Sequence, residues 1–192
     1  MFAAVLDTNV LWPSLQRDYL LTMAALGLYR PLWSEAILEE LHEHETLKLI
    51  KRGASPERAA ARAEHLIGQM RRHFDDALVT GWEPLEGSFG LKDVDDEHVV
   101  AAAVVGGAGV IVTDNLPDFP AEKMPAHIDV HDAKTFAANT ATVDPQLAVR
   151  ALTETATRHH SPETPSDILD ALVNIYQMTD LDGLLRPLLT TG

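Results

Sequence analysis

Residues 109–119 read GVIVTDNLPDF, and this stretch decides the fold class of the chain. Its first five residues form a short apolar run rich in β-branched side chains, which predicts a buried strand. Asp114 and Asp118 follow in a loop that contains prolines. A second apolar run, residues 2–6, ends in the same abrupt way at Asp7. Such buried strands, alternating with helices along the chain, predict an α/β protein with a parallel sheet.

Helical patterns fill most of the chain between these strands. Pro31 should end the first helix and Gly106-Gly107 the last of them, while Ser34 and Ser55 are suitable N-caps for two others. We expect helices at residues 10–29, 34–51, 56–74 and 93–105, and further strands at 76–82 and 128–131. The tail predicts three short helices at 145–158, 165–176 and 181–189, with a linker at 159–165. We therefore divide the chain into an α/β domain, residues 1–140, and a helical C-terminal extension, residues 141–192.

Composition excludes several classes of protein. With 192 residues, 46% of them hydrophobic, the chain can bury one core. It has no cysteine, which excludes disulfides and thiolate metal sites. No apolar run is long enough to span a bilayer, and the N-terminus lacks the pattern of a signal peptide. We therefore expect a cytoplasmic protein without a membrane partner.

The charge is strongly negative but unevenly distributed. A formal net charge of −14 argues against nonspecific binding to nucleic acid. However, seven of the 15 Lys and Arg residues lie between Lys48 and Arg72. This basic arm is either a solvated helix face or a surface for RNA or a protein partner. Its candidate RNA-binding residues are Arg58, Arg62, Arg71 and Arg72.

Acidic residues occur where an α/β fold can bring them together. Asp7, Asp114 and Asp118 follow the two strands, and sites in open parallel sheets form beyond the carboxyl ends of strands. Asp96 precedes Val99, Val100 and Ala103 at helical spacing and should share their sheet-facing side, whereas Asp95 and Glu97 should not.

Glu40 is the fourth place of interest. Helical periodicity puts it beside an apolar stripe and turns its neighbour Glu39 away. The stripe is expected to contain Ala36, Ile37, Leu41 and Leu47. Gathered carboxylates repel one another unless a cation compensates, and carboxylate oxygens are the ligands that Mg²⁺ or Mn²⁺ prefers. Such a site activates water for attack at phosphorus.

A zinc site is the weaker alternative on the same helix. His42 and His44 lie beside Glu39 and Glu43. Residues i and i+2 of a helix point to different faces, so this pattern favours a solvated surface. His159-His160 falls in the expected linker and is also interpreted as surface.

Four segments, in this order, resemble the PIN domain family and within it the VapC-type toxins. They are VLDTNVL (residues 5–11), LEEL (38–41), DDEHVVAAA (95–103) and VIVTDNLPDF (110–119). The resemblance implies a three-layer PIN-like fold with a central parallel sheet, covering about two thirds of the chain.

The resemblance also implies roles for individual acids. Asp7, Glu40 and Asp96 resemble the first three catalytic acids of the family, and Asp7 and Asp96 bind metal. Family members often have a Thr, then Asp or Asn two residues later, and then Asp-Phe. Here Thr113, Asn115 and Asp118-Phe119 take these positions, so Asp118 is the preferred fourth acid and metal ligand. Asp114, an additional acid at a position that usually varies, stays in reserve as a metal ligand.

Three polar residues are implied to support these acids. Asn9 resembles the polar partner that follows the first Asp, and Thr113 resembles the hydroxyl that braces the site. Asn115 completes the set at the turn after the second strand.

The function that the resemblance implies is a Mg²⁺- or Mn²⁺-dependent endoribonuclease. In this family metal-activated water cleaves structured RNA such as tRNA, and a cognate antitoxin silences the enzyme. A homodimer is a further expectation, with the extension as a cap or a dimerisation element. The alternative is a PIN-like module that binds RNA or protein without cleaving. The intact set of acids argues against this alternative.

Overall fold

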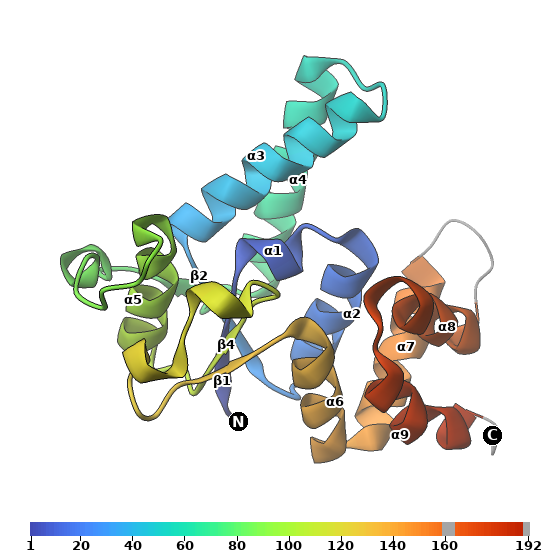
Figure 1. Ribbon diagram of the computed structural model, residues 1–192. Helices are drawn as coiled ribbons and strands as arrows, with labels where there is room; N and C mark the ends of the chain where they lie inside the picture. The colour runs from blue at the N-terminus through green and yellow to red at the C-terminus, as the bar shows by residue number, and fades with distance from the viewer. Residues whose placement is uncertain (159–163, 190–192) are drawn as a thin grey trace.

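The computed structural model describes residues 1–158 and 164–189, with a five-stranded parallel sheet at the centre (Figure 1). The strands follow the order β3-β2-β1-β4-β5, and each neighbouring pair is parallel. The order reverses between β1 and β4, so the chain leaves these two strands in opposite directions. Their carboxyl ends form the switch point at which ligands bind in such sheets. The bounds are β1 (Ala3–Leu6), β2 (Arg30–Ser34), β3 (Leu78–Val79), β4 (Val110–Val112) and β5 (Asp129–His131).

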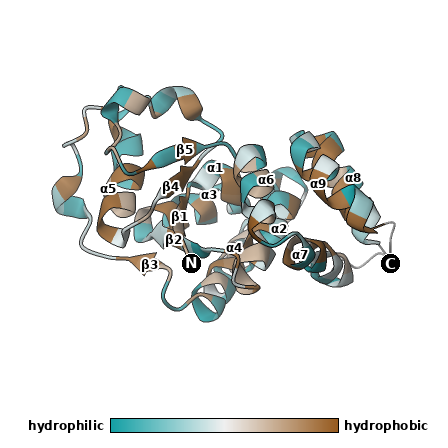
Figure 2. Ribbon diagram, turned by 90° about the horizontal axis from the view of Figure 1, so that it is seen from below, coloured by the Kyte–Doolittle hydropathy of each residue, from teal (hydrophilic) through white to brown (hydrophobic). Residues whose placement is uncertain are grey.

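Helices cover both faces of the sheet. Helix α5 (Glu97–Gly106) lies on one face, while α2 (Ser14–Ala25) and α6 (Ala133–Val143) lie on the other (Figure 2). The three central strands β2, β1 and β4 are largely buried between these layers, as expected for a parallel sheet covered on both faces. The three-layer α/β fold with a central parallel sheet is therefore confirmed.

Helices α3 (Glu35–Lys51) and α4 (Pro56–His73) pack side by side and project beyond the sheet (Figure 1). The predicted caps are present. The Ser34 hydroxyl oxygen accepts a hydrogen bond from the Ile37 N–H at 3.2 Å, and that of Ser55 from the Arg58 N–H at 3.4 Å. A single turn, α1 (Thr8–Leu11), starts directly after β1. Short 3₁₀ turns occur at η1 (Glu83–Leu85), η2 (Val94–Asp96), η3 (Leu116–Asp118) and η4 (Ala121–Lys123).

The C-terminal extension is helical, as predicted. It contains α7 (Pro145–Arg158), α8 (Pro165–Tyr176) and α9 (Thr179–Leu189), which lie outside α2 and α6 (Figure 2). The buried Tyr19 hydroxyl of α2 donates to the Ala148 carbonyl of α7 at 3.4 Å. The boundary at residues 140/141 lies within α6 and stays a prediction. Residues 159–163 of the expected linker, including His159-His160, lie outside the described residues.

The predicted helix at residues 10–29 was wrong in extent. Pro13 separates α1 from α2, and the chain leaves α2 at Ala25 to form β2, which was not predicted. Pro31 fits this strand because its backbone nitrogen faces the β3 side. The Arg30 N–H donates to the Phe2 carbonyl just before β1, and the Trp33 N–H donates to the Ala77 carbonyl just before β3. Strand β2 pairs with β3 only from Trp33 onward. A proline is tolerated where the ladder needs no N–H donor. Helix α6 was also missed.

Within the described ranges, 1–158 and 164–189, no helix combines the length and the apolar character needed to cross a membrane.

Gly106 marks a close approach between α5 and the sheet. A Cβ at this position would lie 2.8 Å from both the Leu32 Cδ1 and the Val79 Cγ2 atoms. We expect Gly106→Ala to lower the free energy of unfolding by about 1–3 kcal/mol, because the buried contact is overpacked. Urea unfolding followed by circular dichroism measures the change.

Gly183→Ala is the matched control for this substitution. Gly183 lies in α9, and a Cβ there meets no atom within 4 Å. Alanine should therefore stabilise the helix slightly, by up to about 1 kcal/mol. Equal effects at the two glycines would contradict the packing argument.

Candidate functional site

Asp7 lies at the carboxyl end of β1 and is 4% exposed. Its Oδ1 accepts the Thr8 N–H at 2.6 Å and thereby caps α1. Its Oδ2 accepts hydrogen bonds from the Thr113 hydroxyl at 2.7 Å and from the Asn9 amide at 2.6 Å. Burial raises the pKa of Asp7 more than these bonds lower it. The carboxylate is therefore held in one orientation at an electrostatic cost.

Asn9 and Thr113 join the ends of β1 and β4. The Asn9 amide also donates to the Thr113 hydroxyl oxygen at 2.9 Å, and its carbonyl oxygen accepts the Asp114 N–H at 2.9 Å. The Asn115 N–H donates to the same Thr113 oxygen at 3.1 Å. These residues therefore brace the Asp7 carboxylate from behind, in the positions where a supporting role was expected.

Glu40 reaches the same place from α3. Its Oε2 accepts the Thr8 hydroxyl at 2.7 Å, and its Oε1 lies 3.1 Å from the His98 Nε2. Burial acts to raise the pKa of Glu40, but the hydrogen bonds with His98 and Thr8 keep that pKa below its ordinary value. Glu40 is therefore an ionised, oriented carboxylate. Glu39 is exposed and points away, as helical periodicity predicts.

Asp96 approaches from η2, directly before α5. Burial, followed by the charges of Asp7, Asp93 and Asp118, raises the pKa of Asp96 to about 6. Its Oδ2 atom is buried without a hydrogen-bond partner. An unpaired buried carboxylate oxygen beside other acids is costly unless a cation joins them.

Asp118 and Asp114 differ in what they contact. Asp118 lies near enough to Asp96 to raise its pKa, and it accepts a hydrogen bond from the Asn115 amide. The exposed Asp114 instead accepts the Ala133 N–H at 3.0 Å at the start of α6. The electrostatic effect on Asp96 thus favours Asp118 over Asp114 as the member of the acid cluster.

The donors suit a divalent oxygen-seeking cation. Asp7, Asp96 and Asp118 interact electrostatically, and the bare Oδ2 of Asp96 has no other partner. Carboxylate oxygens are the ligands that Mg²⁺ or Mn²⁺ prefers. Among the residues that the structure describes, no three His, Asp or Glu side chains already stand in a metal-holding arrangement. The donor chemistry fits such an ion, although the side chains would have to move closer together to bind it.

The basic arm divides into two faces. Arg58, Arg62 and Arg72 are exposed on α4, on the side away from its buried residues. Arg71 lies on another side of the helix and forms an ion pair with Glu35 of α3. Lys48 is mostly buried and contacts Glu45. Three of the four predicted RNA-binding arginines therefore share one exposed surface.

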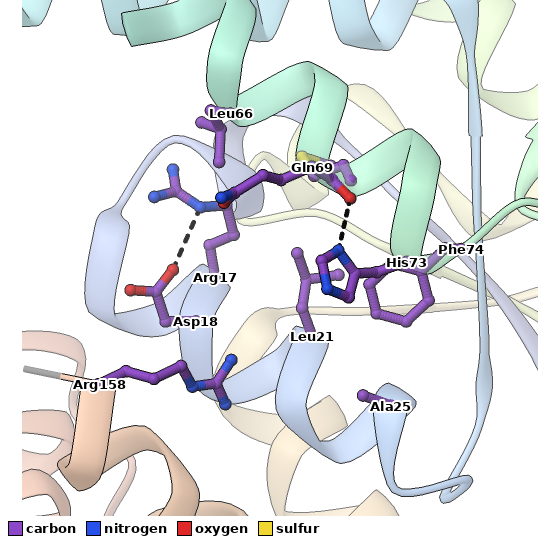
Figure 3. A pocket seen from close by; sticks show the side chains of 10 residues that line it. Arg17, Asp18, Leu21, Ala25, Leu66, Gln69, His73, Phe74 and Arg158 are labelled. Carbon is purple, nitrogen blue, oxygen red and sulfur yellow. Dashed lines mark hydrogen bonds and ion pairs between the residues drawn. The ribbon is translucent and has the colours of Figure 1, made fainter.

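A separate pocket of about 150 Å³ lies between α2 and α4. Figure 3 shows Arg17 and Asp18 paired at 3.4 Å on one side, with Arg158 of α7 approaching from below. The apolar part of the lining includes Leu21 and Phe74. None of the residues that line this pocket belongs to the acid cluster.

Sequence reasoning missed two residues of the site and misjudged two others. Thr8 and His98 hold Glu40, and their only signal was their position beside Asp7 and Asp96. Glu97 was placed off the buried face but is 1% exposed and accepts the Leu91 N–H at 2.9 Å. It braces the loop before η2, because a buried carboxylate needs such donors. Leu47, expected in the apolar stripe, is 55% exposed because α3 extends beyond the core there.

Comparison with known protein families gives one match for this chain. A family model described as PIN domain matches residues 3–116, more than half of the chain. The match includes Asp7, Glu40, Asp96 and Thr113 and ends before Asp118. Searches of curated proteins and of solved structures gave no match.

Proposed function

Because this chain belongs to the PIN domain family, whose members are generally nucleases, we propose that it is a divalent-metal-dependent endoribonuclease. The observation that carries the proposal is the convergence of Asp7, Asp96 and Asp118 at one sheet edge, with Asp96 Oδ2 unpartnered. Purely structural carboxylates would be paired with donors or cations, as Glu97 is.

Each residue has a stated task in this proposal. Asp7, Asp96 and Asp118 would hold Mg²⁺ or Mn²⁺, and Thr113 with Asn9 would keep Asp7 in position. The bound ion would supply an activated water and neutralise charge at the phosphate. Glu40, kept ionised by Thr8 and His98, would accept a proton from the attacking water.

Cleavage of RNA in the presence of metal tests this function. Purified protein is incubated with total RNA in Mg²⁺, in Mn²⁺ and in EDTA, and the products are resolved by gel electrophoresis. We expect discrete fragments with either metal and none in EDTA, with 5′-phosphate ends. Intact RNA under all three conditions would favour a non-cleaving module that binds RNA or protein.

The biological proposal is narrower and rests on the resemblance to VapC-type toxins. We infer a toxin whose substrate is structured RNA, with tRNA as the first candidate. The partner would be a cognate antitoxin, and a homodimer would be the assembled form. An antitoxin arginine could pair with the gathered carboxylates and displace the metal. Growth arrest on expression, relieved by the co-expressed antitoxin gene, would support this assignment.

The exposed arginines of α4 give a prediction about RNA affinity. Replacing Arg58, Arg62 and Arg72 together with Gln should weaken binding and flatten its salt dependence. The logarithmic slope should fall by about 2, at about 0.7 for each lost phosphate contact to a single strand. Fluorescence anisotropy with labelled RNA at several salt concentrations measures the slope.

Arg71→Gln is the matched control on the same helix. Its guanidinium is engaged by Glu35, so it should contribute little to the salt dependence. If the triple variant keeps the wild-type slope, these arginines are only a solvated helix face.

A further inference from the structure

One large aromatic side chain next to the site is left open to solvent. Trp12 is 41% exposed, whereas Trp33 is 0% and Trp82 is 8% exposed. Trp12 is the C-cap residue of α1, the same turn that carries Thr8 and Asn9 of the site. Single exposed apolar residues are common on proteins, so exposure alone assigns no role. The position and support of this indole are more informative.

Trp12 lies one turn beyond the catalytic contact between α1 and α3. Thr8 contacts Glu40 through its hydroxyl, and four residues further along each helix the Trp12 ring meets the His44 ring. The ring centroids are 6.3 Å apart with 33° between the planes. Four residues, slightly more than one turn, correspond to about 6 Å along a helix. The indole therefore lies about one helical turn from the contact between Thr8 and Glu40.

Lys48 holds this tryptophan in place. Its ammonium donates to the Trp12 carbonyl at 3.0 Å and to the Ser14 hydroxyl at 3.1 Å, and it lies 5.8 Å from the indole centroid. The side chain of Lys48 is only 10% exposed and also pairs with Glu45. Because its charge is already engaged, Lys48 does not serve as a phosphate ligand. It fixes the backbone and ring of Trp12 while part of the indole stays open.

Resting on the proposed ribonuclease function, we propose that Trp12 stacks on an unpaired base of the RNA next to the scissile phosphate. Base stacking on aromatic rings is the usual way to recognise single-stranded segments and loops, and it tolerates different sequences. It also suits a chain of net charge −14, because stacking adds affinity without positive charge. The substrate class is therefore RNA with an unpaired nucleotide at the cleavage site.

Tryptophan emission tests the contact directly, because the other two indoles are buried. A short single-stranded RNA is titrated into the Asp7→Asn protein with Mg²⁺ present, so that binding is followed without cleavage. We expect saturable quenching in the protein that keeps Trp12. With fluorescence anisotropy of labelled RNA as the measure of Kd for all variants, Trp12→Ala should raise Kd about tenfold and Trp12→Phe, which keeps an aromatic face, should raise it less. The quenching itself should disappear in the Trp12→Phe protein. Val143→Ala, an exposed apolar residue on α6, is the control and should leave Kd unchanged.

A modified RNA distinguishes stacking from an indirect effect on folding. Removing the one base beside the cut should weaken binding about tenfold in the presence of Trp12 and have little further effect in Trp12→Ala. An unchanged Kd in Trp12→Ala would overturn the proposal. Additive losses of affinity when the base and the Trp12 ring are both removed would also overturn it. So would a variant that binds RNA normally but no longer binds its protein partner, because Trp12 would then be a protein contact.

The wild-type cleavage assay separates this proposal from the proposed function. If wild type cleaves RNA and Trp12→Ala cleaves with the same KM, the stacking proposal fails and the function stands. If wild type does not cleave but RNA quenches Trp12, the function fails and the stacking contact stands.

Discussion

Asp7→Asn and Asp96→Asn should each reduce the cleavage rate by at least about 1,000-fold while the fold persists. Each substitution removes one charged oxygen ligand from the carboxylate cluster, and loss of several kcal/mol of transition-state stabilisation corresponds to such a factor. Single-turnover cleavage at saturating Mg²⁺ measures the rate, and circular dichroism checks the fold. Wild-type cleavage by either variant would remove these acids from the mechanism.

Stability without metal provides an independent measurement on Asp96. Since the folded state raises the pKa of this half-exposed carboxyl to about 6, ionisation at neutral pH destabilises the fold. Asp96→Asn should therefore raise the free energy of unfolding by about 1 kcal/mol in EDTA, after allowance for solvent screening. This gain in the free energy of unfolding should vanish below the ordinary pKa of aspartate, where the carboxyl of Asp96 is neutral in both the folded and the unfolded state. For Asp7→Asn the gain should be smaller, because Asp7 accepts hydrogen bonds from three donors.

The fourth acid is tested by the same assay. Asp118→Asn should lose most activity, because this carboxylate lies near enough to Asp96 to raise the pKa of Asp96. Asp114→Asn should remain active and lose some stability, because its carboxylate accepts the Ala133 N–H at the start of α6. The reverse result would transfer the metal-binding role to Asp114.

Glu40→Gln should be the second substitution with a large effect, lowering kcat by at least about 100-fold. The amide retains the size of the side chain but cannot accept a proton from water, and its charge no longer faces the phosphate. Glu39→Gln is the matched control one residue away. Glu39 is exposed outside the cluster, so its variant should stay within about twofold of wild type by the same reasoning.

The comparison of Glu39→Gln with Glu40→Gln also checks which side of α3 faces the acid cluster. Pre-steady-state rates at saturating RNA separate a fall in kcat from weaker binding. If the two variants behave alike, Glu40 does not act through its contacts with Thr8 and His98.

Strands and helices with a regular apolar pattern, or with capping and polar residues at their ends, could be predicted from the sequence. The strands at Asp7 and Thr113 are short apolar runs that end in polar residues, and Ser34 and Ser55 cap helices by local hydrogen bonds. Such signals depend on neighbours within a few residues, so they survive in the folded protein. The orientation of Glu40 relative to Glu39 followed from helical geometry for the same reason.

Features that depend on distant partners could not be predicted in this way. Pro31 indicated a helix end, yet it lies in β2, and whether it is tolerated there depends on where β3 begins to pair. His98 looks like any first-turn residue of α5 until Glu40 arrives from a helix 58 positions earlier. Glu97 resembles a solvated acid until the preceding loop folds over it.

The contact between α7 and α2 has a consequence for how the protein can be divided experimentally. Tyr19 and Thr22 of α2 are covered by α7, through the Ala148 carbonyl and the Thr155 hydroxyl. A chain shortened after residue 140 would open this flank to water and end α6 within its last turn. The flank belongs to α2, the helix that immediately follows the turn α1 with Thr8 and Asn9. Loss of activity in the shortened chain could therefore come from damage to the support of the site as well as from the missing residues. Full-length protein with point substitutions is therefore the appropriate material for assigning roles to individual side chains.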